Sequence, residues 1–202
     1  MSDLESKEFI QSCLCDEKGF IKAEFLLSND NGLEILVDES CLGILFDELS
    51  KFIKFYNLEM EINSREVLYK FFKKCNSKEN IFSNDELFCD IEFKENDHEK
   101  FLTKAEFDLN ILLMGQFLFN YQDVDKHRPH DVGMNKSHVS FSKGCFRGQE
   151  VIARTEHLSK KKKEIISIKA EDEESIKSKK IKTLKEVTIE GNTFKLVSFI
   201  PD

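Results

Sequence analysis

The feature that most restricts the fold is a stretch in which two glycines flank a cysteine, directly before a helical pattern. Gly144 and Gly148 enclose Cys145, so the backbone can bend tightly or approach a ligand closely on both sides of the sulfur. Apolar residues recur at helical spacing over Gln149–His157, and this helix is expected to start just after Gly148. The chain therefore places a tight loop at a helix N-terminus.

This loop is a candidate for chemistry. The free N–H groups and the positive end of the helix dipole would face the bend. Lys143 and Arg147 add positive charge on either side of Cys145, so its thiol is expected to have a lowered pKa, and the loop could also hold an anion. The alternative is that Cys145 is a small buried residue in a glycine turn. The residues alone leave both interpretations open.

The stretch Lys143–Glu150 resembles the K-G-C-Y-x-G-Q-E signature of the YgfZ-type folate-binding proteins, relatives of the glycine-cleavage T protein. Phe146 is the one departure from that pattern, where it replaces a tyrosine. The residues before it also resemble the family, because Arg128–Met134 contains a proline turn and Val139–Ser142 leads into the motif. The resemblance covers about residues 128–157.

The resemblance implies an accessory protein that binds tetrahydrofolate and supports the assembly or repair of iron–sulfur clusters, and indirectly tRNA modification. Cys145 would be its catalytic thiol, and its partners would be the folate and iron–sulfur enzymes or their assembly proteins. The residues implied at the folate are Lys143, Gly144, Phe146, Gly148, Gln149, Glu150, Arg154, His130 and Asp131.

Two other functions remain open. One is a tetrahydrofolate-dependent aminomethyltransferase of the T-protein class, against which stand Cys145 and the Gln149-Glu150 ending of the motif. The other is an interaction domain without a ligand.

Composition narrows the classes of function further. The 202 residues carry a net charge of −8, which argues against direct nucleic-acid binding because phosphate contacts need concentrated Lys and Arg. The six cysteines include no CxxC pair, and the first residues are polar and acidic. We therefore expect a cytoplasmic monomer with reduced thiols and no membrane span.

The pattern of elements predicts an α+β fold. An amphipathic helix over Leu42–Ile53 takes Asp38 or Ser40 as its cap. A second helix begins at the capping box Thr103–Glu106 and runs as far as residues 117–119. The strands expected from alternation, β propensity and turn residues are Phe20–Leu27, Leu33–Val37, Leu58–Ile62, Val67–Phe72, Leu87–Phe93, Glu164–Ile168, Glu186–Ile189 and Thr193–Phe199.

This order suits ferredoxin-like subdomains, in agreement with the T-protein fold that the resemblance implies. Residues 1–158 would form two intertwined subdomains around a central pocket that binds the folate. Residues 159–202 would form a small C-terminal β segment, where family members carry a larger β-barrel.

Two clusters of metal-ligand residue types are interpreted without a metal. Cys13 and Cys15 offer two thiolates to a soft ion, but no second pair accompanies them, so we expect two thiols on one buried strand face. His127, His130 and His138 lack the spacing of a metal site and are expected to be loop residues near a pocket mouth.

One charged pair is expected to support the cysteine loop. Glu150 and Arg154 stand four residues apart on one helical face and are expected to pair. Together with Gln149 they would hold the loop around Cys145 in place, because partly buried pairs beside a tight loop fix its geometry.

Overall fold

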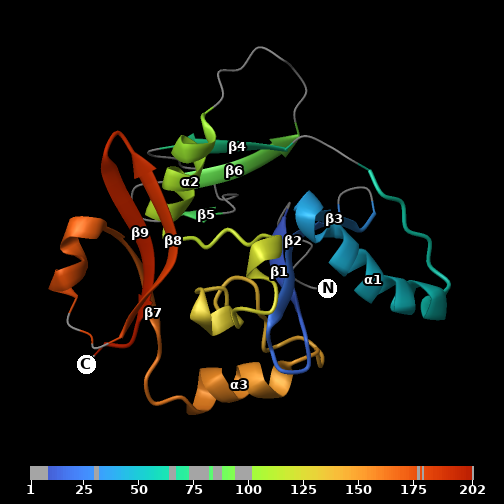
Figure 1. The fold of residues 1–202 in the computed structure, drawn as a ribbon. Helices are drawn as coiled ribbons and strands as arrows, with labels where there is room; N and C mark the ends of the chain where they lie inside the picture. The colour runs from blue at the N-terminus through green and yellow to red at the C-terminus, as the bar shows by residue number, and fades with distance from the viewer. Residues whose placement is uncertain are drawn as a thin grey trace.

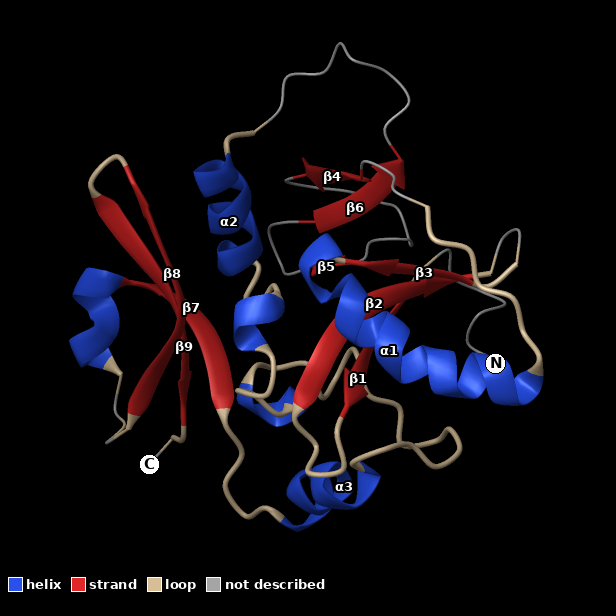
Figure 2. Ribbon diagram, turned by 45° about the vertical axis from the view of Figure 1, so that its right-hand side comes forward, coloured by secondary structure: helices blue, strands red, loops and turns tan. Residues whose placement is uncertain are grey.

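The computed structural model describes residues 9–29, 32–63, 67–72, 82–83, 88–93, 102–176, 178 and 180–201. They form an α+β fold, which confirms the predicted class. Three antiparallel sheets of three strands each, in the orders β1-β2-β3, β4-β6-β5 and β7-β9-β8, surround a long irregular segment that runs from α2 to α3 (Figures 1 and 2). The strands and longer helices are β1 (Ile10–Cys15), β2 (Ile21–Ser28), β3 (Glu34–Val37), α1 (Glu39–Tyr56), β4 (Val67–Phe72), β5 (Phe82–Ser83), β6 (Phe88–Phe93), α2 (Lys104–Leu113), α3 (Gln149–Leu158), β7 (Glu164–Lys169), β8 (Ile181–Ile189) and β9 (Asn192–Phe199).

The first sheet confirms the first two predicted strands, Phe20–Leu27 and Leu33–Val37. Strands β2 and β3 pair antiparallel with Phe25 opposite Val37, and β1 pairs with the other edge of β2. Helix α1 follows, and Asp38 is its N-cap, because its carboxylate accepts the Ser40 N–H at 2.9 Å. Leu45 on the apolar stripe of α1 is buried in the main core, as the pattern predicted.

The segment after α1 is a correction. Leu58–Ile62 was expected to be a strand, but it forms no strand ladder within the described residues. Asn57 ends the helix in the left-handed conformation, and the apolar side chains of Leu58, Met60 and Ile62 are all exposed. Alternation alone does not make a strand, because the backbone also needs a neighbouring strand to pair with.

Helix α2 begins as predicted and ends earlier. Thr103 and Glu106 form the capping box. The helix stops at Leu113, because Gly115 adopts a φ of +71° and its N–H closes the last turn on Leu112. The phenylalanines expected in the helix, at positions 117 and 119, instead lie in an extended segment and are buried in the main core.

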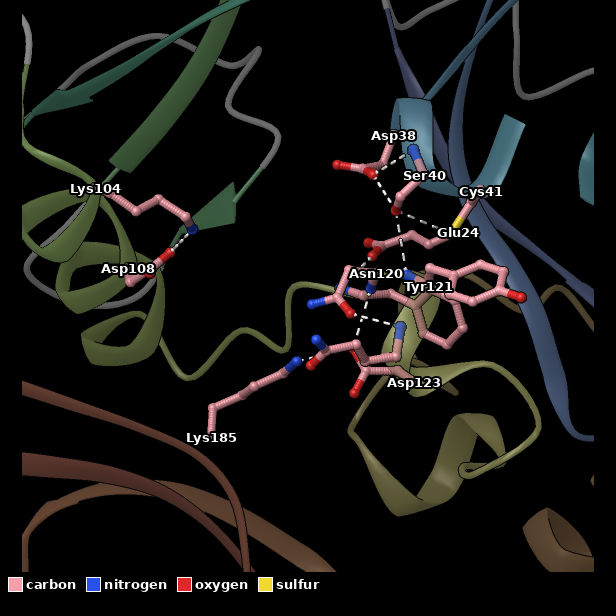
Figure 3. Close-up of polar contacts among 12 residues, drawn as sticks. Glu24, Asp38, Ser40, Cys41, Lys104, Asp108, Asn120, Tyr121, Asp123 and Lys185 are labelled. Carbon is pink, nitrogen blue, oxygen red and sulfur yellow. Dashed lines mark hydrogen bonds and ion pairs between the residues drawn. The ribbon is translucent and has the colours of Figure 1, made fainter. Parts of the chain in front are cut away.

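The C-terminal strands form a sheet of their own that shares the main core. Leu196 of β9 is fully buried in the same cluster as Ile21 of β2 and Ile152 of α3. Figure 3 shows a polar contact between this sheet and the irregular segment after α2, in which Lys185 of β8 donates to Asp123 at 2.8 Å. The chain turns from β8 into β9 at residues 190–191, which have positive φ angles of 50° and 80°.

None of the helices in the described part of the chain combines the length and the apolar character that a membrane span requires.

Candidate functional site

The loop Lys143–Gly148 lies against the turn Asp16–Gly19, which joins β1 to β2. Gly148 is the N-cap of α3 with a φ of +79°. A Cβ at this position would meet the Asp16 carbonyl oxygen at 2.5 Å and the Gly19 Cα at 2.9 Å. Only glycine fits there, so the predicted tight loop is confirmed, and its close neighbour is the backbone of a second turn.

The Asp16–Gly19 turn is held in a fixed conformation by hydrogen bonds. The Asp16 carboxylate accepts the N–H groups of Lys18 at 2.9 Å and Phe20 at 2.8 Å, and Gly19 adopts a φ of +78°. Arg128 closes it from outside, because its Nε donates to the Lys18 carbonyl at 3.1 Å and its guanidinium lies 4.6 Å from the Phe20 ring centre. The turn is therefore fixed by its own hydrogen bonds and by the segment that precedes the motif.

Arg147 ties three distant segments together. Its Nε donates to Glu17 at 2.8 Å, and its Nη1 donates to Glu48 of α1 at 2.6 Å. These hydrogen bonds raise the pKa of Arg147, and the same contact lowers the pKa of Glu48. Arg147 was expected to add positive charge beside Cys145, but its charge is neutralised by two carboxylates. Its role in the structure is to anchor the loop.

Cys145 is exposed at the surface of the loop, which rules out the interpretation of a buried turn residue. The residue after it, Phe146, packs against the main core, and its N–H donates to the Gln149 side chain at 3.2 Å. The Gln149 N–H in turn donates to the Phe146 carbonyl at 3.1 Å, so the loop itself uses the first N–H of α3. Lys143 holds its ammonium group 5.1 Å from the Phe146 ring centre. The sulfur is thus presented to solvent next to an anchored residue, Phe146.

Glu150 and Arg154 pair at 3.1 Å as expected, but they do not brace the loop. Their side chains are 85% and 69% exposed, so the pair lies in solvent on the outer face of α3. Of the three residues expected to hold the loop, Gln149 is the one that bonds to it. Arg154 lines a shallow surface depression of about 340 Å³ with Thr155, Leu158 and Ser159, toward the C-terminal end of the helix.

His130 belongs to a second polar cluster, at the C-terminal half of α3. Its Nε2 lies 2.8 Å from Glu156, and the same carboxylate accepts hydrogen bonds from Asn135 at 3.0 Å and Lys162 at 2.8 Å. Lys162 and then His130 lower the pKa of Glu156 to about 2. The Nδ1 atom of His130 is buried and has no hydrogen-bond partner among the residues that the structure describes.

Asp131 lies beside this cluster. Burial alone would raise its pKa, but the hydrogen bonds from Lys163 and from the Arg128 backbone outweigh burial, so its pKa is lowered. Gln149 and Glu156 are seven residues apart on α3, which separates the two clusters by about 10 Å along the helix axis. Within the described residues no hydrogen bond or ion pair joins His130 or Asp131 to the loop. The predicted folate-binding residues therefore fall into two groups on α3. The loop residues lie at its N-terminal end, and His130 and Asp131 lie near its C-terminal half.

His127 and His138, the other two histidines of the predicted cluster, lie in the interior. The expectation that they lie near a pocket mouth was wrong. His138 is buried, and its Nε2 lies 2.8 Å from Glu24 of β2. His127 is buried beside Phe117, and burial lowers its pKa. Its Nδ1 finds no hydrogen-bond partner in the described part of the chain. Within the described residues, no three His, Cys, Asp or Glu side chains gather as they would around a metal ion.

Cys13 and Cys15 lie side by side on β1, with their sulfur atoms 3.9 Å apart. The expectation that they share one strand face is confirmed. Their hydrogen bond is the largest cause that raises the pKa of Cys13 well above its ordinary value and lowers the pKa of Cys15.

Sequence reasoning missed the residues that act at long range. Glu17, Glu48 and Glu156 carry no local pattern that distinguishes them from other surface carboxylates. The Asp-Glu-Lys-Gly sequence at Asp16–Gly19 is typical of a turn, but nothing in it indicates a contact with Gly148. Compared with known proteins, the chain matches no family model and no curated sequence.

Proposed function

We propose that this protein is a cytoplasmic folate-binding accessory factor that supports the assembly or repair of iron–sulfur clusters. Its α+β subdomains would be arranged around a central folate pocket, as in the T-protein family. The observation that supports this best is the exposed thiol of Cys145 on a loop fixed by Arg147 and Gly148, within a stretch that resembles the family signature.

The residues of the loop suit this role. The anchored residues directly after Cys145, Phe146 to Gly148, limit the motion of an exposed sulfur, which favours a defined encounter with a client protein or cluster. The exposed Lys143 suits a carboxylate of the folate. Bound tetrahydrofolate would supply its pterin ring as a one-carbon acceptor or as a structural ligand.

Calorimetric titration with tetrahydrofolate tests the proposal. Binding at micromolar or tighter affinity is expected, and Lys143→Ala should weaken it about tenfold, the size of one charge-assisted contact. Lys160→Ala, which removes one charge from the run Lys160–Lys163, is the matched control and should bind as the wild type does. The absence of heat and of a thermal shift at millimolar folate would contradict folate binding.

The thiol is tested separately in cells. Cys145→Ala should keep its folate affinity and melting temperature but lose support for an iron–sulfur enzyme in a deletion strain, because a methyl group cannot replace a nucleophilic or metal-binding sulfur. Full complementation by this variant would remove the sulfur from the mechanism.

A second candidate, the ligand-free interaction domain, is favoured by a different observation. The end of α1 and the segment after it expose large apolar side chains, with Phe55 80% exposed. The residues of this exposed set are Phe52, Phe55, Tyr56 and Leu58. Such a surface is typical of protein contacts. Failure of the folate titration, together with loss of client support in Phe55→Ser, would favour this candidate.

A further inference from the structure

The thiol pair of β1 has a geometry that the sequence did not reveal. The sulfur atoms of Cys13 and Cys15 are 3.9 Å apart, across a register irregularity between Leu14 and Cys15. Cys15 is 5% exposed and Cys13 is half-buried, so a small ion can reach the pair from the side of Cys13.

The separation suits a metal ion better than a disulfide. With metal–sulfur bonds of about 2.3 Å, two thiolates on one ion stand about 3.8 Å apart in tetrahedral geometry and about 4.0 Å apart in trigonal geometry. A disulfide instead needs sulfur atoms about 2.05 Å apart. Residues i and i+2 of a strand have Cα atoms about 6.6 Å apart, near the upper limit for a disulfide. The pair can therefore hold an ion without moving the backbone.

We propose that Cys13 and Cys15 form a two-thiolate site for a thiophilic d¹⁰ metal ion, Zn²⁺ or Cu⁺. On binding, both S–H groups release their protons to solvent and two metal–sulfur bonds form, with no change in oxidation state.

The site holds the ion by two ligands of this chain. Within the described residues no third His, Cys, Asp or Glu joins the pair at metal-binding distance. Water or a small thiol completes the coordination, so the ion is exchangeable rather than structural. This site is separate from Cys145 and does not depend on folate binding.

The experiment combines native mass spectrometry with residue-specific alkylation of the reduced full-length protein. One equivalent of Zn²⁺ or of Cu⁺ is added without oxygen, in separate samples that distinguish the two ions. Trypsin releases Cys13 and Cys15 together in residues 8–18, which contain no other cysteine. We expect a mass gain of one ion and at least tenfold slower alkylation of this peptide, while the alkylation of Cys145 is unchanged.

Variants locate the site. Cys13→Ser should weaken binding at least a hundredfold, because one of two thiolates is lost, whereas Cys145→Ser should bind as the wild type does. No ion bound, protection of Cys145 in place of the pair, or unchanged binding by Cys13→Ser would each overturn the proposal. If Cys15→Ser does not fold, the alkylation pattern of the wild type still decides.

Discussion

Two arginines near the cysteine loop have the same chemistry and opposite surroundings. Arg147 bonds to Glu48 and Glu17, which are 99 and 130 residues away in the sequence. Arg154 bonds to Glu150, four residues away, and both side chains lie in solvent. The exposed pair follows from helix geometry and contributes little, whereas the distant pairs hold separate segments together. The comparison indicates that the loop is fixed by what lies far from it in the sequence.

The largest expected effect comes from the glycine beside Arg147. Gly148→Ala should lower the free energy of unfolding by about 3 kcal/mol, because alanine is strained at positive φ and its Cβ would press on the backbone of Asp16. Gly144→Ala is the matched control, since nothing lies within 4 Å of a Cβ at that position, and it should change the stability by less than about 0.5 kcal/mol. Urea unfolding measures both. Equal stabilities would contradict the tight contact between the two turns.

The next effect tests the two arginines directly. Arg147→Ala should speed hydrogen exchange of the backbone amides in residues 143–148 about tenfold, since the loop loses its anchor on α1 and on the turn. Arg154→Ala removes an equal charge from the exposed pair and should leave exchange in these residues unchanged. A similar increase in both variants would mean that net charge, and not anchoring, controls the loop.

The smallest effect concerns pH and the other end of α3. The pKa of Glu156 is lowered to about 2 from an ordinary value of 4.5, so its stabilising contribution is complete above about pH 4.5 and is lost as the pH falls toward 2. Glu156→Gln should therefore be less stable than the wild type at pH 6, and the difference should shrink as the pH is lowered. Urea unfolding at several pH values measures this.

Glu150→Gln is the control for the pH experiment, because it alters a carboxylate of the exposed pair on the same helix. Its stability should follow that of the wild type at every pH. A pH-independent difference between Glu156→Gln and the wild type would show that the contacts of Glu156 with Lys162 and His130 do not depend on its charge.

Local features of the fold were predictable from the sequence. The hairpin of β2 and β3, the Asp38 cap of α1 and the capping box at Thr103 follow from turn residues, caps and periodicity within a few positions. The start of α3 after Gly148 follows in the same way. Each depends on backbone geometry and contacts within one or two turns of chain, so a single sequence contains the information.

The tertiary structure decided which of these features cooperate. Periodicity predicted a strand at Leu58–Ile62 and a longer α2, but strand pairing and the buried positions of Phe117 and Phe119 are set by distant neighbours. The sequence showed two glycines around Cys145 and a helix after them. The contacts of Arg147 with two distant carboxylates, and of Gly148 with the Asp16–Gly19 turn, depend on packing between distant segments and appear only in the structure. Charge and composition are properties of the chain, but the partner of each charge is chosen by packing.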